Sequence, residues 1–211
     1  MQSLDPDAQL MLAFRDGDEE ALSALYRRWA GPVQRFLERM VRERATAEEL
    51  MQETFVRVHG ARDRYAADAR FSTWLFRIAR NLALNELDRA RNKSTHLSAD
   101  VRSRDDEERP ALTLVAGGAS VDELVHARRE RERLEGELAA LPERQRTALW
   151  LSAVEGHSYA EIAEVLEASP QSVKALIHRA RARLADRLHP AGDAAGETAA
   201  APETPRTEGS R

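Results

Sequence analysis

The sequence predicts an all-α protein built from two small helical bundles joined by a flexible linker. Apolar residues recur at helical spacing, and no stretch alternates apolar and polar residues for long enough to form a strand. Several segments begin with Ser or Thr followed three residues later by Glu, a pattern typical of helix N-termini. Between residues 93 and 119 the periodicity is lost, and Pro110 and the Gly117-Gly118 pair indicate a linker.

The periodic segments predict eight helices in two groups. They run over about 7–15, 19–43, 47–58 and 72–91 in the first bundle, and 120–138, 142–154, 158–166 and 170–188 in the second. We therefore divide the chain into a first domain at 7–92, an acidic linker at 93–119, a second domain at 120–189 and a tail at 190–211. The tail has no apolar pattern, and we expect it to be disordered.

Residues 158–189 are the most informative segment. Ser158 and Glu161 form a predicted capping box, and Ser169 precedes Pro170 at the first position of the last helix. The apolar residues of that helix fall on one side, which we expect to pack inward: Val173, Leu176, Ile177, Ala180 and Leu184. The remaining face offers hydrogen-bond donors, positive charge and one small residue: Gln171, Ser172, Lys174, Ala175, His178 and Arg179. This face suits a DNA major groove. A lone helix of this kind would more often be an ordinary basic helix exposed to solvent. Two capped helices joined by a short turn favour a DNA-binding helix-turn-helix instead.

The segment around this motif resembles a known family. Residues 141–184, with Tyr159-Ala-Glu-Ile-Ala163 and Val173-Lys-Ala-Leu-Ile-His-Arg-Ala-Arg181, resemble region 4 of bacterial sigma factors of the extracytoplasmic-function (ECF) group. The output domains of response regulators contain similar helices. The first half of the chain decides between them, because residues 46–58 resemble sigma region 2.2 and residues 69–89 resemble the joined regions 2.3 and 2.4.

The resemblance assigns roles to residues of the first half. It implies that Glu49, Gln52 and Glu53 bind the β′ clamp helices of core RNA polymerase, although Thr46 and Glu49 also form a possible capping box, so Glu49 could serve only its own helix. It implies −10 promoter recognition and melting by a set of basic, aromatic and amide side chains: Arg70, Phe71, Trp74, Arg77, Arg80, Asn81 and Asn85. Phe71 and Trp74 would edge a pocket for a flipped base, whereas Phe76 is expected in the core. Arg77 and Arg80 would contact phosphate.

Composition is consistent with this interpretation. The net charge is −4, but residues 62–93 carry eight basic and four acidic side chains. Residues 174–187 carry five basic side chains and one acidic side chain, that of Asp186. Negative charge collects at residues 105–108 of the linker, a spacer that could also act as a displaceable RNA mimic. The two candidate DNA surfaces are therefore locally basic.

The sequence has no motif that would support another class of protein. The chain has no cysteine, no apolar run long enough to span a membrane and no signal peptide, so we expect a cytoplasmic protein. The six histidines lack metal-ligand spacing, and no nucleotide-binding loop or nucleophile elbow is present, so we expect no metal, no cofactor and no enzyme activity.

We therefore interpret the chain as an alternative sigma factor of the ECF group. The resemblance implies core RNA polymerase (β′ clamp helices and β flap) and promoter DNA as partners, together with an anti-sigma factor. Two alternatives remain at this stage. A two-domain regulator would bind duplex DNA without being a polymerase subunit, and an adaptor of polymerase would not need the basic face of the last helix.

Overall fold

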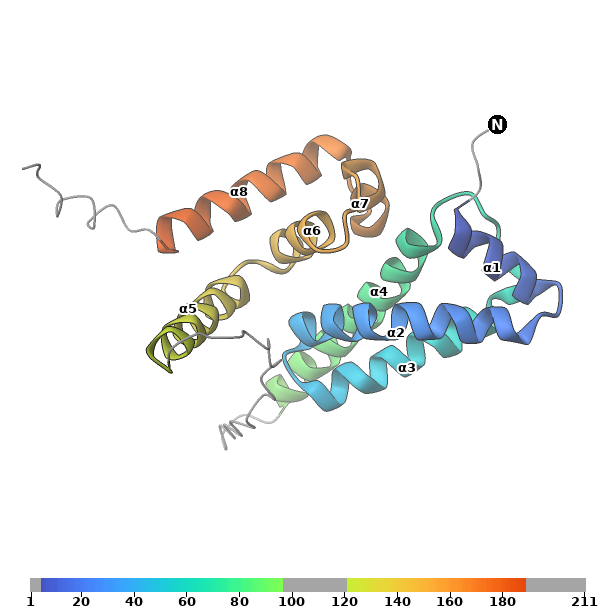
Figure 1. The fold of residues 1–211 in the computed structure, drawn as a ribbon, viewed down its shortest axis with the longest axis horizontal. Helices are drawn as coiled ribbons and strands as arrows, with labels where there is room; N and C mark the ends of the chain where they lie inside the picture. Colours follow the sequence, from blue (N-terminus) through green and yellow to red (C-terminus); the bar gives the residue numbers. More distant parts are fainter. Residues whose placement is uncertain (1–4, 97–120, 189–211) are drawn as a thin grey trace, which may run out of the picture.

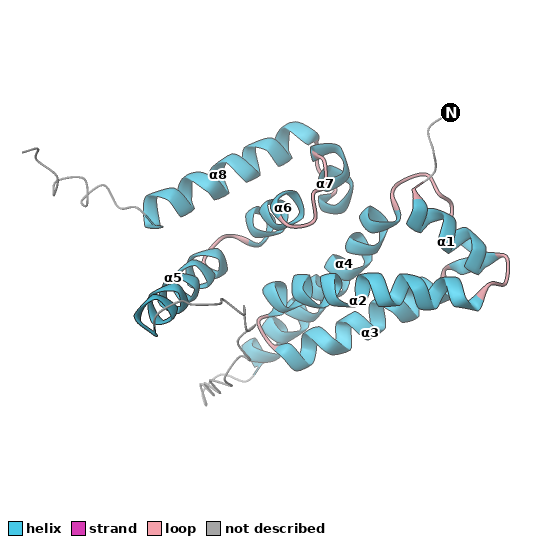
Figure 2. Ribbon diagram, in the orientation of Figure 1, coloured by secondary structure: helices cyan, strands magenta, loops and turns pink. Residues whose placement is uncertain are grey.

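The computed structural model describes residues 5–96 and 121–188, and within these ranges the chain forms eight α-helices and one short 3-10 turn (Figure 1). The elements are α1 (Pro6–Arg15), α2 (Glu19–Val41), α3 (Arg44–Gly60), η1 (Arg62–Arg64), α4 (Phe71–His96), α5 (Val121–Ala139), α6 (Glu143–Ala153), α7 (Tyr159–Leu166) and α8 (Pro170–Leu188). No strand occurs in the described part of the chain, so the all-α prediction is confirmed (Figure 2). Most of the predicted linker, with its acidic run, and the predicted tail lie outside the described residues.

Helices α1 to α4, together with η1, form the N-terminal bundle, in which α2 and α3 run side by side and α4 packs against both (Figure 1). Its core is aromatic. Phe36 and Phe76 meet edge to face with ring centroids 5.2 Å apart, and Trp29 meets Phe76 in the same way at 5.9 Å. The prediction that Phe76 belongs to the core is confirmed, because its side chain is fully buried.

The start of α4 is fixed by α1. The carboxylate of Asp5 accepts a hydrogen bond of 2.9 Å from the backbone amide of Phe71, which supplies one of the donors that a helix N-terminus leaves unpaired. Asp7, which is buried, accepts hydrogen bonds from Arg28 and Trp29 of α2. Asp5 thus ties the start of the first helix to the start of α4, and Asp7 ties the first helix to α2.

Helices α5 to α8 form the C-terminal bundle, whose core lies between α6, α7 and α8. Val173, Ile177 and Ala180 of α8 are buried, as the helical periodicity predicts, and Leu176 and Leu184 are half-buried. Helix α5 contacts this core through the last turn of α8: Glu137 pairs with Arg187 at 2.9 Å, and Arg133 donates to the carbonyls of Arg187 and Leu188. Residues 125–134 of α5 are exposed.

The two bundles share one hydrophobic core. Helix α7 packs against α4, and α6 packs against α2, so that residues of α6, α7 and α8 join the buried cluster of α1 to α4. Figure 1 shows α6 and α7 beside α4, with α8 on the outer side of the C-terminal bundle. Separate bundles joined only by a linker would not have this arrangement.

The start of α3 differs from the sequence prediction. The helix begins at Arg44 with Glu43 as its N-cap residue, so Thr46 lies inside the first turn and its hydroxyl donates to the Glu43 carboxylate. The predicted capping box of Thr46 with Glu49 is therefore wrong. Glu49 is exposed in the second turn and does not cap the helix.

Candidate nucleic-acid interface

Helices α7 and α8 form the predicted helix-turn-helix. The capping box is confirmed in both directions, since the Glu161 amide donates to the Ser158 hydroxyl and the Ser158 amide donates to the Glu161 carboxylate at 2.7 Å. Glu167 ends α7 in the left-handed conformation with φ 50°, and the hydroxyl of Ser169 then accepts from the Ser172 amide to start α8. Helix α8 thus leaves the turn in a fixed direction.

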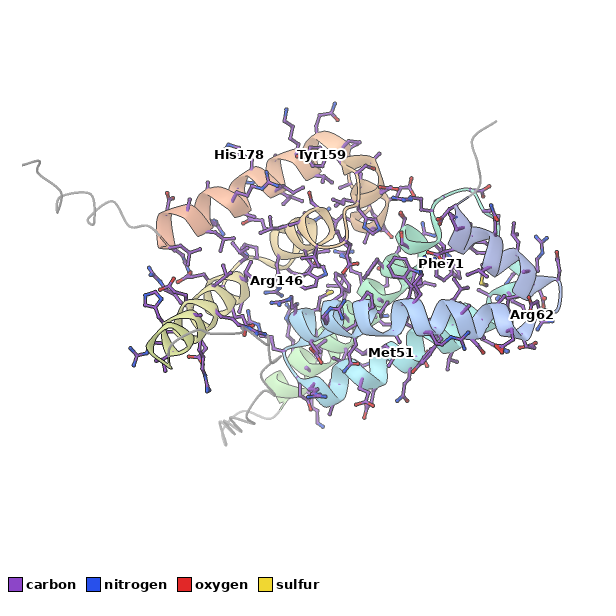
Figure 3. All side chains as sticks on the ribbon, viewed as in Figure 1. Met51, Arg62, Phe71, Arg146, Tyr159 and His178 are labelled. Atoms are coloured by element: carbon purple, nitrogen blue, oxygen red, sulfur yellow. The ribbon has the colours of Figure 1, made fainter. Side chains whose placement is uncertain are left out.

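The predicted reading face of α8 is open to solvent. All six of its residues are exposed: Gln171, Ser172, Lys174, Ala175, His178 and Arg179. In Figure 3, His178 lies on the side of α8 that faces away from the N-terminal bundle. The face presents amide, hydroxyl, imidazole and cationic donors with a small residue between them, which is the chemistry that base edges and phosphates accept.

A cavity of about 590 Å³ opens between η1, the loop that follows it and the first turns of α4. Trp74 is half-buried in its wall, and its ring meets Tyr65 with centroids 5.0 Å apart. The other lining residues mix cations, carboxylates and small side chains: Ala61, Arg64, Ala66, Asp68, Ala69, Thr73, Arg77 and Glu164. An aromatic wall beside cations suits a planar base that carries a phosphate.

Phe71 does not stand at the edge of this cavity, so the sequence expectation for its position is wrong. Its side chain is fully buried, 5.8 Å from the ring of Trp74 and 6.4 Å from that of Tyr65 by centroids. Figure 3 shows Phe71 inside the N-terminal bundle at the start of α4. Phe71 therefore supports the two aromatic rings from behind, and the ring exposed to the cavity is that of Trp74.

Two buried hydroxyls behind the wall of this cavity were missed by the sequence analysis. Tyr65 and Thr73 are both buried, and neither hydroxyl has a hydrogen-bond partner among the described residues. Burial, reinforced by the negative charges of Asp5, Asp68 and Asp7, raises the pKa of Tyr65 to about 12. The phenol therefore stays protonated and can donate. No sequence pattern marks these positions, because Tyr65 lies in a loop and Thr73 has the spacing of an ordinary core residue.

The predicted arginines of α4 differ in their accessibility. Arg77 is exposed at the cavity, and Asn81 and Asn85 are exposed further along α4. Arg80 is buried, and its guanidinium donates to both oxygens of Glu143 on α6, at 3.1 and 3.4 Å. The expectation that Arg80 lies free to meet phosphate is therefore wrong for this conformation, because a carboxylate of the C-terminal bundle occupies it.

Arg70 is also paired with the C-terminal bundle. Its guanidinium lies 3.3 Å from the carboxylate of Glu161, the residue that also caps α7. Burial alone would raise the pKa of Glu161, but the hydrogen bonding with Ser158 and the charges of Arg70 and His157 outweigh it, and the pKa is lowered. Glu161 is therefore ionised at neutral pH.

The residues expected to bind polymerase lie on α3, away from the cavity. Glu49 and Gln52 are exposed, and Glu53 is half-buried and paired with Arg57 one turn later at 3.0 Å. Because Glu49 does not cap α3, the alternative explanation that it serves only its own helix no longer applies. The three side chains share one surface of α3 at helical spacing.

Family comparisons agree with this division of the chain. Residues 25–93 match the model of sigma-70 region 2, and residues 131–184 match that of sigma-70, region 4. The chain is 37% identical over 178 residues to the RNA polymerase sigma factor CarQ of Myxococcus xanthus, covering 84% of this chain and 95% of the relative. It is 28% identical over 178 residues to the ECF RNA polymerase sigma factor SigW of Bacillus subtilis, covering 82% of this chain and 92% of the relative.

Solved structures give the same answer at the level of the fold. A structure of CnrH in complex with the cytosolic domain of CnrY matches with a TM-score of 0.61 and 26% identity, covering 86% of this chain and 96% of that one. The sigma factor RpoE of Bartonella quintana, in complex with the anti-sigma factor NepR, matches with a TM-score of 0.61 at 22% identity, covering 79% and 95%. No helix in the described ranges is long and apolar enough to cross a membrane.

These matches define the protein as a transcription initiation factor with sigma regions 2 and 4 in the family's order. The chain belongs to the sigma-70 family of RNA polymerase sigma factors. Its relatives place it in the ECF group, and it is an alternative sigma factor.

Proposed function

We propose that the protein binds core RNA polymerase through α3 and directs it to promoters that it reads at two places. In this proposal the surface of Glu49, Gln52 and Glu53 contacts the β′ clamp helices, and the C-terminal bundle contacts the β flap. The exposed face of α8 reads the −35 element, and the surface of α4 around the cavity captures unpaired −10 bases. The two domains would follow the predicted bounds, 7–92 and 120–189, and the protein would act in the cytoplasm without catalytic activity of its own.

The cavity carries this proposal most strongly. Trp74 offers a ring for stacking, Arg77 is exposed beside it, and the hydroxyls of Tyr65 and Thr73 have no partner within the described chain. Stacking of one unpaired base on an aromatic ring contributes about 1–3 kcal/mol. A regulator that reads only duplex DNA has no use for such a cavity, which favours the sigma-factor mechanism over that alternative.

An anti-sigma factor is a further proposed partner. Both solved relatives described above were captured with a second protein: the cytosolic domain of CnrY with CnrH, and the anti-sigma factor NepR with RpoE. We expect this chain to be controlled in a comparable way, through its own partner.

The proposal is tested with core polymerase and the double variant Lys174→Ala/Arg179→Ala. Gel filtration should show that wild type and variant bind core polymerase equally, since both side chains lie on α8 far from α3. Run-off transcription from −35-dependent promoters should fall, because a base-reading arginine contributes about 1–3 kcal/mol of discrimination and a phosphate-contacting lysine adds affinity. Arg128→Ala/Arg131→Ala, which removes two exposed arginines from α5 of the same bundle, outside the proposed face, is the matched control.

Each alternative predicts a different result. A duplex-binding regulator would not comigrate with core polymerase. An adaptor of polymerase would comigrate with it, but the double variant would transcribe as well as wild type.

A further inference from the structure

We infer that the cavity beside Trp74 selects guanine as its unpaired base, and that the carboxylate of Asp68 is the group that reads it. The inference rests on the proposed function of this surface, the capture of unpaired −10 bases. It adds which base the cavity accepts and which side chain decides. In this arrangement Trp74 stacks on the base, Asp68 and Arg64 read its edges, and Arg77 holds a neighbouring phosphate.

The cavity contains charged groups of both signs that do not pair with each other. Asp68, Arg64 and Arg77 all line it, and all three are exposed. None of their side chains forms a hydrogen bond or an ion pair with another residue of the described ranges. One carboxylate and two guanidinium groups are therefore available to a ligand that enters beside Trp74.

The carboxylate of Asp68 lies near the aromatic wall. Burial, followed by the charges of Asp5 and Asp68, raises the pKa of Tyr65 to about 12, so the Asp68 carboxylate is close enough to act on that ring. The ring of Tyr65 in turn lies 5.0 Å from that of Trp74 by centroids. A base stacked on Trp74 would therefore have a carboxylate within the same cavity to receive its donors.

The loop that carries Asp68 is held at both of its ends. Arg62 of η1, which precedes the loop, pairs with Glu19 of α2 at 3.1 Å. At the far end, the backbone amide of Phe71 donates to the carboxylate of Asp5 at 2.9 Å. A loop fixed in this way loses little conformational entropy when a base binds, which favours selective recognition.

The four bases differ in what they offer to such a carboxylate. Guanine presents two adjacent donors on its Watson–Crick edge, N1–H and N2–H, which the two oxygens of one carboxylate accept as a bidentate pair. Its O6 and N7 atoms accept from an arginine, and Arg64 enters the cavity from η1. Cytosine and adenine each present one amino donor. Thymine presents a single N3–H between two carbonyl oxygens, which a carboxylate repels, so the cavity favours guanine most and thymine least.

The test varies the base and leaves the duplex out of the measurement. Holoenzyme, assembled from core polymerase and the full-length chain, transcribes promoter templates that are pre-melted across the −10 element. Each non-template base of that element is replaced in turn by the other three. Pre-melting removes the cost of opening the duplex, so the ratio of transcription between two bases at one position reports the selectivity of capture.

For wild type we expect one −10 position at which guanine exceeds thymine by about tenfold, as for one bidentate base contact. Asp68→Asn should level the four bases at that position, because an amide both donates and accepts and every Watson–Crick edge offers a donor beside an acceptor. The variant should remain active, since Trp74, Arg64 and Arg77 are unchanged.

Two matched controls remove one carboxylate each. Asp63→Asn changes an exposed carboxylate of η1 that lies 3.4 Å from Arg62 and does not line the cavity. Glu164→Gln changes the other carboxylate of the cavity, which enters from α7 of the C-terminal bundle. Both variants should keep the wild-type preference for guanine.

Three results would overturn the inference. A wild-type profile without a preference for guanine, or an unchanged profile in Asp68→Asn, would show that Asp68 does not read the base. An equal loss with all four bases in Asp68→Asn would leave Asp68 with a role in supporting the loop only. Loss of the preference in either control would assign it to another carboxylate or to net charge.

Trp74→Ala on the corresponding duplex templates separates the inference from the proposed function. Reduced transcription with every base, together with any of the three results above, would show that the cavity captures a base without selecting guanine. Transcription equal to that of wild type would show that the cavity captures no base, and the proposed function of this surface would fail together with the inference.

Discussion

The ring of Trp74 is supported on one side and open on the other, which suits a residue that stacks on a base. Phe71 and Tyr65 hold its ring from the protein side, and its other side faces the cavity. We expect Trp74→Ala to impair open-complex formation by about 1–3 kcal/mol, the value of one base stack. Permanganate footprinting should show a larger defect on duplex than on pre-melted promoter templates. Trp74→Phe should retain most of the activity, and equal defects on the two templates would indicate damage to the core instead.

For Tyr65 we predict separately how one substitution affects the stability of the protein and how it affects transcription. Its buried hydroxyl has no partner in the described chain, and an unsatisfied buried donor costs about 1–3 kcal/mol. Tyr65→Phe should therefore leave the thermal unfolding temperature unchanged or raised. The buried hydroxyl does not reach the cavity, so the same variant should discriminate between −10 bases as wild type does, as measured by transcription from a set of single-base promoter variants. A lowered unfolding temperature would contradict this account of Tyr65.

At single residues, sequence reasoning succeeded where the helix itself decides the outcome. The exposed face of α8 follows from its periodicity, and Trp74 follows from the motif. It failed for Phe71 and Arg80, whose surroundings come from distant segments. Asp5 fixes the amide of Phe71, and Glu143 covers Arg80. No local pattern contains either partner.

At the scale of elements, α7 depends strongly on its cap because it is short, from Tyr159 to Leu166. Ser158→Ala removes the hydroxyl that accepts from the Glu161 amide, and we expect a loss of about 1 kcal/mol in the free energy of unfolding. Chemical denaturation of the full chain measures it. Ser158→Thr keeps the hydroxyl and should unfold close to wild type; a comparable loss in the threonine variant would show that the cap hydroxyl is not the cause.

The caps also show why helix starts are only partly predictable. The box at Ser158 is unambiguous, because the Gly156 turn precedes it and the apolar pattern begins after it. Ahead of α3, two polar starts compete, and the helix begins at Arg44 although Glu43 makes no side-chain cap hydrogen bond. The sequence contains both possibilities. The local pattern does not choose between them, so the predicted box of Thr46 and Glu49 is wrong while the helix itself is correctly predicted.

For the whole molecule, the order and number of the predicted helices match the described structure, but the packing of one bundle on the other was not anticipated. The charge pattern of the chain indicated two basic DNA surfaces. It did not show that Glu143, Glu161 and Glu164 face one of them, because these residues are more than sixty positions away in sequence and look like ordinary helix caps and surface charges.

The packing of the C-terminal bundle on the N-terminal bundle should respond to acid through His157, whose ring lies against that of Phe76 with centroids 5.6 Å apart. Burial lowers the pKa of this imidazole and the charge of Arg70 adds to that effect, against the opposing influence of Glu161 and the nearby carbonyls of Leu151 and Glu155. The imidazole is therefore neutral at neutral pH while the bundles are packed together, and its pKa rises when they part and water reaches the ring. Since the separated bundles bind the proton more readily, the packed arrangement loses stability as the pH falls through the ordinary range of histidine and keeps it at higher pH.

Protonation of Glu161, whose pKa is lowered, removes the Arg70 pair only at still lower pH. Energy transfer between dyes on cysteines introduced by Ala45→Cys and Ala182→Cys, at exposed positions of α3 and α8, should therefore shift towards longer distances as the pH falls below the ordinary range of histidine. His157→Phe fills the same apolar site against Phe76 without a titrating group, and this variant should stay closed until Glu161 protonates. His178→Phe, on the exposed face of α8, should open with the wild-type pH dependence. If His157→Phe opened over the same pH range as wild type, another group would control the interface.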